Sequence, residues 1–219
     1  MIRKFLIGLS TLLAASIVLF GIYGVIGWYD AINDTETLQR RADAIIAGNR
    51  GGDSLPPDRL NILLLVQDPG FYAHSGVDLH TPGAGLTTLT QSISKRLAFD
   101  SFTPGIGKIR QTGYALGLDS RLTKEQQIAL FLETAEMGQS RQGWITGFHN
   151  ASEHFFGAPP QEISEENFLT LVAVLIAPGT LKLAEPSDRL RERVRRIARL
   201  SRGECKASAL NDVWLEGCG

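Results

Sequence analysis

The stretch "LLLVQDPGFYAHSGVD", residues 63–78, is the most informative part of the sequence. It runs from an apolar ridge directly into Gln67 and Asp68, and an aromatic pair and His74 follow. A carboxylate at position 67, at the end of a buried run and beside a cleft, would be a candidate general base. A primary amide cannot accept a proton at ordinary pH, so Gln67 makes catalytic competence the central question for this chain.

The N-terminal part of the chain predicts a membrane anchor over residues 1–29. Residues 5–29 contain no charged side chain, and a helix of that length can cross a hydrocarbon core of about 30 Å. Arg3 and Lys4 precede the apolar run and acidic residues follow it, which predicts a single-pass protein with residues 30–219 outside the cytoplasm. A cleaved signal peptide and a buried core helix are the alternatives.

Composition limits the classes of partner. The 219 residues are 43% apolar, which suits one domain with a proper core. The formal net charge is −1, so bulk charge gives no case for nucleic acid as a partner. Leu190, Val194 and Ile197 form one apolar stripe near the end of the chain. Seven arginines between residues 189 and 202 lie elsewhere on this segment, and their face is either solvated or in contact with anionic lipid head groups.

Helical signals dominate the part of the chain that follows the predicted anchor. Glycine and proline pairs in residues 30–59 predict a linker, and the folded domain is expected over residues 60–219. Thr123 begins a capping box before an apolar stripe that Gly138 would stop, and Ser164 caps an apolar helix. No convincing strand alternation is visible, so the predicted class is mainly α.

The two cysteines lie close together near the end of the sequence. In an exported domain Cys205 and Cys218 can form a disulfide that stabilises the fold by on the order of 3 kcal/mol. Two free thiols are the alternative. The spacing does not fit a four-ligand metal site, and no protein metal site is predicted.

Three further polar stretches accompany residues 63–78. Residues 83–95, "GAGLTTLTQSISK", combine small and hydroxyl residues with Lys95, a composition suited to binding an anion. Residues 107–111, "GKIRQ", and residues 131–138, "FLETAEMG", with Glu133 and Glu136, complete the set. Each stretch is a weak signal when it is taken alone.

Together, the order and spacing of these stretches resemble the peptidoglycan glycosyltransferases of family 51, from about Leu60 to Arg196. The family motif Glu-Asp-x-x-Phe-x-x-His-x-Gly is matched at residues 67–76 except at its first position, which is Gln67. The second motif is met by Gly85, Thr87, Thr88, Thr90, Gln91 and Lys95, with Leu86 in place of a glycine. The third motif, Arg-Lys-x-x-Glu, becomes Gly107-Lys108-Ile109-Arg110-Gln111.

The resemblance implies a lysozyme-like helical domain that acts on lipid II, the pyrophosphate-linked glycan precursor, in the bacterial inner (cytoplasmic) membrane. It implies lipid II or nascent glycan, the membrane and other cell-wall synthesis proteins as partners. The resemblance implies no definite cofactor, and a divalent cation such as Mg²⁺ could accompany the pyrophosphate. The catalytic positions it indicates are Gln67, Asp68 and Gln111, and the substrate-binding positions are Phe71, His74, Thr87, Thr88, Thr90, Gln91, Lys95, Lys108 and Arg110.

Three hypotheses follow from the two amides. In the first, the chain binds lipid II or nascent glycan but is catalytically impaired, because Gln67 and Gln111 replace both glutamates of the family. In the second, it is an active glycosyltransferase that uses a displaced carboxylate, for which Asp68, Glu133 and Glu136 are the candidates. In the third, it is a structural protein with an occluded groove that binds a partner.

Overall fold

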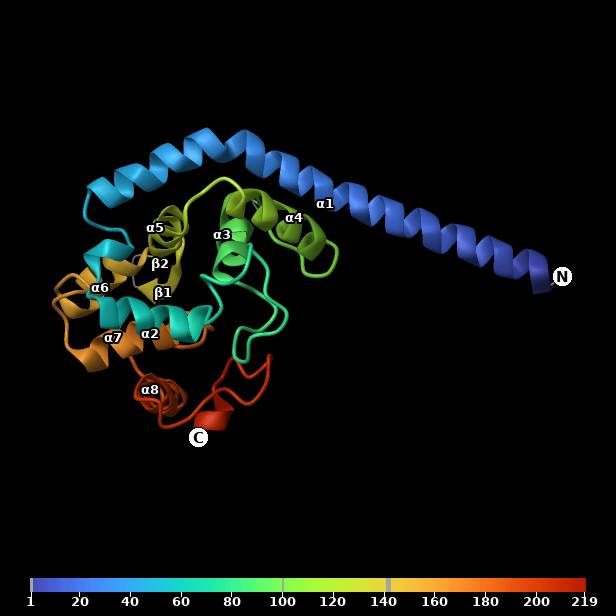
Figure 1. Ribbon diagram of the computed structural model, residues 1–219. Helices are drawn as coiled ribbons and strands as arrows, with labels where there is room; N and C mark the ends of the chain where they lie inside the picture. The colour runs from blue at the N-terminus through green and yellow to red at the C-terminus, as the bar shows by residue number, and fades with distance from the viewer. Residues whose placement is uncertain (1, 100, 141–142) are drawn as a thin grey trace.

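The computed structural model describes residues 2–99, 101–140 and 143–219, so Met1 of the predicted anchor lies outside the described residues. The chain is mainly α-helical with one long apolar helix at its N-terminal end, as the sequence predicts (Figure 1). The elements follow in the order α1 (Ile2–Ala47), η1 (Gly52–Ser54), α2 (Pro57–Gln67), α3 (Leu89–Leu97), α4 (Gly107–Asp119), α5 (Lys124–Thr134), β1 (Glu136–Ser140), β2 (Gly143–Thr146), α6 (Phe148–Phe156), α7 (Glu165–Val174), α8 (Asp188–Ser201) and η2 (Glu216–Cys218).

Helix α1 projects far from the rest of the molecule (Figure 1). Its first part is long and apolar enough to cross a membrane, and the rest of the protein does not cover that part. Where α1 reaches the domain it packs on α4 at very close range. A Cβ atom at Gly113 would lie 1.9 Å from the carbonyl oxygen of Gly24, so only glycine allows this approach of the two helices.

The structure differs from the predicted linker over residues 30–59. Helix α1 continues without interruption to Ala47, because Ala31, Leu38 and Ala42 form a buried stripe against the domain. The Tyr114 hydroxyl of α4 donates to the Asp34 carboxylate at 2.6 Å and fixes the same face. Residues 30–47 are therefore part of the packed domain, and only a short segment around η1 connects α1 to α2.

The core centres on α5, which packs against α1, α3 and α6. The predicted capping box of Thr123 and Gln126 starts this helix, and Ser164 caps α7 as expected. The end of α5 differs from the prediction, because the helix stops at Thr134 and β1 pairs with β2 in an antiparallel hairpin. Gly138 sits in β1 with a φ of 111°, a conformation that favours glycine.

The last part of the chain confirms the predicted disulfide. Cys205 and Cys218 are bonded, with their Cα atoms 5.3 Å apart. Leu190 and Ile197 of α8 are fully buried, as the apolar stripe predicts. Arg193 is also buried, at 2% exposure, so not all of the arginines on this helix are solvated.

Candidate functional site

A cavity of about 260 Å³ opens at the C-terminal end of α2. Its lining includes Gln67, the segment 83–89, Phe131 of α5 and Arg193 of α8. Gln67 is half-buried and makes one long hydrogen bond, from its Nε2 atom to the carbonyl oxygen of Val172 at 3.4 Å. Among the described residues, no aspartate or glutamate lines this cavity, and the Gln67 amide in its lining cannot accept a proton.

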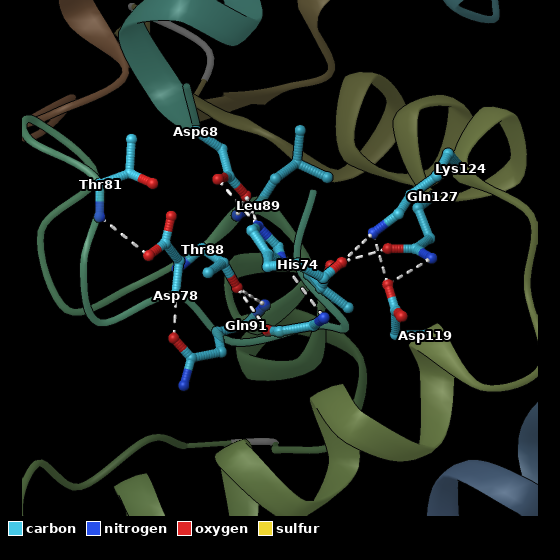
Figure 2. Close-up of polar contacts among 12 residues, drawn as sticks. Asp68, His74, Asp78, Thr81, Thr88, Leu89, Gln91, Asp119, Lys124 and Gln127 are labelled. Carbon is cyan, nitrogen blue, oxygen red and sulfur yellow. Dashed lines mark hydrogen bonds and ion pairs between the residues drawn. The ribbon is translucent and has the colours of Figure 1, made fainter. Parts of the chain in front are cut away.

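Asp68, the residue after Gln67, is fully buried, and its carboxylate accepts hydrogen bonds from groups of the protein (Figure 2). It accepts a hydrogen bond from the backbone N–H of Leu89 at 2.8 Å and from His74 Nε2 at 2.9 and 3.0 Å. The N–H of Gly76 contacts His74 Nδ1 at 3.1 Å, so both ring nitrogens of His74 have partners within the protein. Asp68 thus ties the loop after α2 to the start of α3.

Phe71 belongs to the core. Its ring is 1% exposed, and the ammonium of Lys124 lies 4.6 Å from the ring centroid. Lys124 in turn donates to the His74 carbonyl oxygen at 2.9 Å and to the Asp119 carboxylate at 2.6 Å (Figure 2). The structure therefore places Phe71 and His74, both predicted to bind substrate, in contacts that hold the loop in place.

Most of the predicted hydroxyl donors are used within the protein. Thr88 is the N-cap of α3, where its Oγ1 atom accepts from the Gln91 N–H at 3.1 Å and donates to the Gly76 carbonyl at 2.7 Å. The Gln91 side chain completes the capping box. Thr90 is buried and donates to Gln127 Oε1 at 2.7 Å. Of the three threonines, only Thr87 is exposed.

The two predicted lysines contact neutral groups of the protein. The Lys108 Nζ atom donates to the Thr87 hydroxyl at 2.8 Å, and the exposed Lys95 lies over the ring of Phe102 at 5.4 Å. Neither lysine pairs with a carboxylate among the ion pairs of the described residues. Burial, and secondly the charge of Lys95, lower the pKa of Lys108 to about 8. An anion between the two lysines would relieve this repulsion.

Arg110 lies away from this pair. Its guanidinium binds the Asp30 carboxylate of α1 through Nε at 3.1 Å and an Nη atom at 2.7 Å, and it stacks on Phe99 at 5.2 Å. The hydrogen bond to Asp30 raises the pKa of Arg110 above its ordinary value. The structure therefore gives Arg110 a role in fixing α1 to α4.

Gln111 is not among the residues that line the cavity beside Gln67. Its side chain is 1% exposed between α4 and α3, where its Nε2 atom donates to the Gln91 carbonyl oxygen at 2.6 Å. Its Oε1 atom is buried and has no hydrogen-bond partner in the described structure. The two amides at the positions where the resemblance expects glutamates are thus in different surroundings, Gln67 in the cavity lining and Gln111 buried between α3 and α4.

The cavity lining also includes residues with no predicted site role, among them Arg193 and Val213 from the C-terminal part of the chain. The Arg193 Nε and Nη atoms donate to the carbonyl oxygens of Ala173 at 3.1 Å and Val213 at 2.8 Å. Arg193 lies three residues after Leu190 and four before Ile197, on the apolar face of α8. That spacing was the available signal for a buried arginine. No comparable signal marked Val213.

The described residues contain no group of three or more histidine, cysteine, aspartate or glutamate side chains that could hold a metal ion. Around Lys95 and Lys108 the described contacts are with cations and the Thr87 hydroxyl, a donor set without the carboxylate that a protein Mg²⁺ site ordinarily supplies. A divalent cation at this place would need its ligands from the phosphates of a bound molecule.

Comparison with known proteins assigns the fold. A family model described as Transglycosylase matches residues 49–201. The chain belongs to the transglycosylase family. Its match encloses the segment from Leu60 to Arg196 on which the sequence resemblance rests, and it ends before the segment closed by the disulfide.

Three relatives show how much of the chain is shared. Penicillin-binding protein 1B of Vibrio cholerae serotype O1 is 31% identical over 154 residues, which cover 64% of this chain and 20% of the relative. Penicillin-binding protein 1B of Escherichia coli K12 is 32% identical over 133 residues, covering 54% and 16%. The biosynthetic peptidoglycan transglycosylase of a Marinomonas species is 29% identical over 154 residues, covering 65% and 67%. The transglycosylase domain therefore spans a fifth or less of the first two relatives.

Proposed function

We propose that this transglycosylase-family chain binds lipid II or nascent glycan at the membrane and transfers glycosyl groups slowly or not at all. The observation that carries the proposal is Gln67, an amide that faces a cavity without a carboxylate among the described lining residues. The lysine pair supports the binding half of the proposal, because neither Lys95 nor Lys108 has an acidic partner among the ion pairs of the described residues.

The chemistry of the reaction explains why ligand binding can persist when glycosyl transfer is slow or absent. In the reaction that the family resemblance implies, a base takes the proton of the acceptor sugar's 4-hydroxyl as its oxygen attacks the anomeric carbon and pyrophosphate leaves. The Gln67 amide can accept a hydrogen bond from that hydroxyl and orient it, but it cannot take the proton. A positioned general base contributes about 10²–10⁴ in rate, or about 3–5.5 kcal/mol of the barrier. Its loss leaves binding possible.

The contacts of the other carboxylates argue against a displaced base. Asp68 is fully buried and held by the Leu89 N–H and His74. Glu133 forms an ion pair with Arg41 of α1 at 2.6 Å and lines a different cavity. Glu136 is exposed on β1, where its charge acts on Arg96. Each would have to leave its present surroundings to reach Gln67's cavity.

The location is part of the proposal. We place residues 5–29 of α1 in the bacterial inner membrane and residues 30–219 on its outer face, because Arg3 and Lys4 precede the apolar run and acidic residues follow it. Membrane proximity would bring the lipid part of lipid II close to α4, which packs on α1. A C-terminal reporter that is active only in the cytoplasm would contradict this orientation.

A polymerisation assay together with a binding measurement tests the function. The purified full chain in detergent should bind lipid II, while its polymerisation rate should be at least about 10²-fold below that of an active relative. Fast polymerisation that Asp68→Asn or Glu133→Gln abolishes would establish a displaced carboxylate instead. Absence of binding would favour the third hypothesis, an occluded groove in a protein that binds a partner.

A further inference from the structure

The segment closed by the disulfide, residues 205–218 and here called the disulfide loop, pairs with the segment that lines the cavity. The backbone N–H of Gly83 donates to the Ala209 carbonyl oxygen at 2.9 Å, and the N–H of Gly85 donates to that of Leu210 at 2.8 Å. The two segments lie side by side in Figure 1, far apart in sequence. They are so close that a Cβ atom at Gly85 would lie 2.6 Å from Val213 Cγ1.

The disulfide loop is ordered internally around Asp212. Its carboxylate accepts from the backbone N–H and the hydroxyl of Ser208 at 2.9 and 3.0 Å, and from the N–H groups of Glu216 and Gly217 at 2.6 and 3.0 Å. Burial raises the pKa of Asp212, but these hydrogen bonds outweigh burial and the pKa lies below its ordinary value. The ionised carboxylate therefore organises the loop at neutral pH.

Helix α8 holds the disulfide loop from the other side. Three arginines one turn apart donate to its carbonyl oxygens, namely Arg193 to Val213 at 2.8 Å, Arg196 to Trp214 at 3.2 Å and Arg199 to Cys218 at 2.8 Å. A fourth, Arg189, stacks on the ring of Trp214 at 4.0 Å. This row of arginines thus binds the loop and connects it to the core.

We propose that the disulfide loop is a wall of the binding cavity that fixes the segment 83–87 in the shape a ligand requires. Val213 and Arg193 line the cavity opposite the end of α2, and the loop bonds hold Gly83 and Gly85. The same segment leads to Thr87, the hydroxyl partner of Lys108. Release of the loop would free this segment, and the arrangement of Thr87 and Lys108 that receives an anion would be lost.

Amide exchange tests the wall without a ligand. The full chain is compared in detergent before and after reduction by dithiothreitol, whose two thiols become a disulfide as Cys205 and Cys218 become thiols. Exchange of the Gly83 and Gly85 amides should accelerate by about tenfold or more, while the amides of Leu130 and Leu132 in α5 stay protected. Unchanged protection at both glycines would overturn the proposal.

A substitution with the disulfide intact covers the case in which reduction unfolds the whole chain. Asp212→Asn removes the charge that orders the loop, and Asp188→Asn is the matched control because the Asp188 side chain is 98% exposed on α8. Exchange that is faster at Gly83 and Gly85 in Asp212→Asn, and unchanged in Asp188→Asn, supports the proposal that the loop is a wall of the cavity. Equal exchange in the two variants and the unchanged chain would overturn it.

The loop affects ligand binding only if the cavity binds the anion proposed above, so binding is measured separately with inorganic pyrophosphate. Reduction or Asp212→Asn should weaken pyrophosphate binding by about tenfold, and Asp188→Asn should not. If the reduced chain or the Asp212→Asn variant binds pyrophosphate as tightly as the unmodified chain, although segment 83–87 is loosened, the wall has no part in binding and the proposal fails on that point. If the unmodified chain does not bind pyrophosphate, the proposed function fails, while the exchange experiment still decides the wall.

Discussion

The two ends of the candidate site differ in the chemical groups they offer: the α4 end offers positive charge, and the α2 end offers a neutral amide. At the α4 end, Lys95 and Lys108 present positive charge that no carboxylate neutralises among the described ion pairs, and the pKa of Lys108 is lowered to about 8 as a result of burial and repulsion. At the α2 end, the position that the family resemblance gives to a general base holds Gln67, which has no charge at any ordinary pH.

The difference teaches that binding and proton transfer can be lost independently. A lysine pair stabilises a pyrophosphate in the ground state as well as in the transition state, whereas a base matters only when the hydroxyl loses its proton. A chain with the first and without the second is expected to hold its ligand without consuming it.

Restoring a carboxylate at the α2 end should give the largest effect. Gln67→Glu is expected to raise the rate of lipid II polymerisation by about 10²–10⁴, because the side chain faces the cavity and is only half-buried. Gln139→Glu, on an exposed position of β1, is the matched control and should leave the rate unchanged. No gain from Gln67→Glu would mean that the cavity geometry, and not the missing base, limits the reaction.

Adding Gln111→Glu should help less than the family pattern suggests. The Gln111 Nε2 atom donates to the Gln91 carbonyl at 2.6 Å, and a carboxylate would put two acceptors face to face in a buried place. We therefore expect Gln111→Glu to lower the free energy of unfolding by about 1–3 kcal/mol. Chemical denaturation measures the loss, and a variant as stable as the original chain would contradict this account.

Removing a cation at the α4 end should reduce affinity by about 10–100-fold, since a charge-assisted contact contributes about 1.5–3 kcal/mol. Lys108→Ala and Lys95→Ala are compared by calorimetry with a phosphoglycolipid or pyrophosphate. Lys182→Ala serves as the control because Lys182 is exposed and lies in the segment between α7 and α8, far in sequence from the lysine pair. If neither Lys95 nor Lys108 matters, the two ends do not differ in the way described above.

The pH dependence of binding should give the smallest effect. Lys108 has a pKa of about 8, so it is charged below pH 8 and loses its proton as the pH rises above that value. Anion affinity is therefore expected to fall by about tenfold between pH 8 and pH 9.5, with one proton taken up on binding. Lys108→Arg should remove this dependence, because a guanidinium keeps its charge throughout the range. A flat profile in the original chain would show that Lys108 does not contact the anion.

Local signals in the sequence predicted much of the fold. The capping residues Thr123 and Ser164 and the apolar stripe of α8 depend on neighbours within a few positions, and all of them recur in the structure. The hairpin was missed because β1 is five residues long and contains a glycine, so it carries no alternation that a pattern could detect.

The site was only partly predictable, because composition does not show which way a side chain points. Thr88 and Thr90 belong to a segment suited to anion binding, yet one caps α3 and the other bonds Gln127 in the core. Arg110 is one of the basic residues in its motif, but its guanidinium forms an ion pair with Asp30 on α1, which is far away in the sequence. Such outcomes depend on contacts between segments far apart in sequence. The roles of these residues toward a ligand stay predictions.

The uninterrupted course of α1 from its apolar part to Ala47 also has a geometric meaning. With the apolar part in a bilayer, α1 is a continuous helical connection to the domain, because the close contact of Gly24 with Gly113 restricts rotation between α1 and the domain. The number of residues in this helix then sets the height of the cavity above the lipid surface and the direction in which the cavity opens. Each inserted residue would lift the domain by about 1.5 Å and turn it by about 100° relative to the bilayer-embedded part.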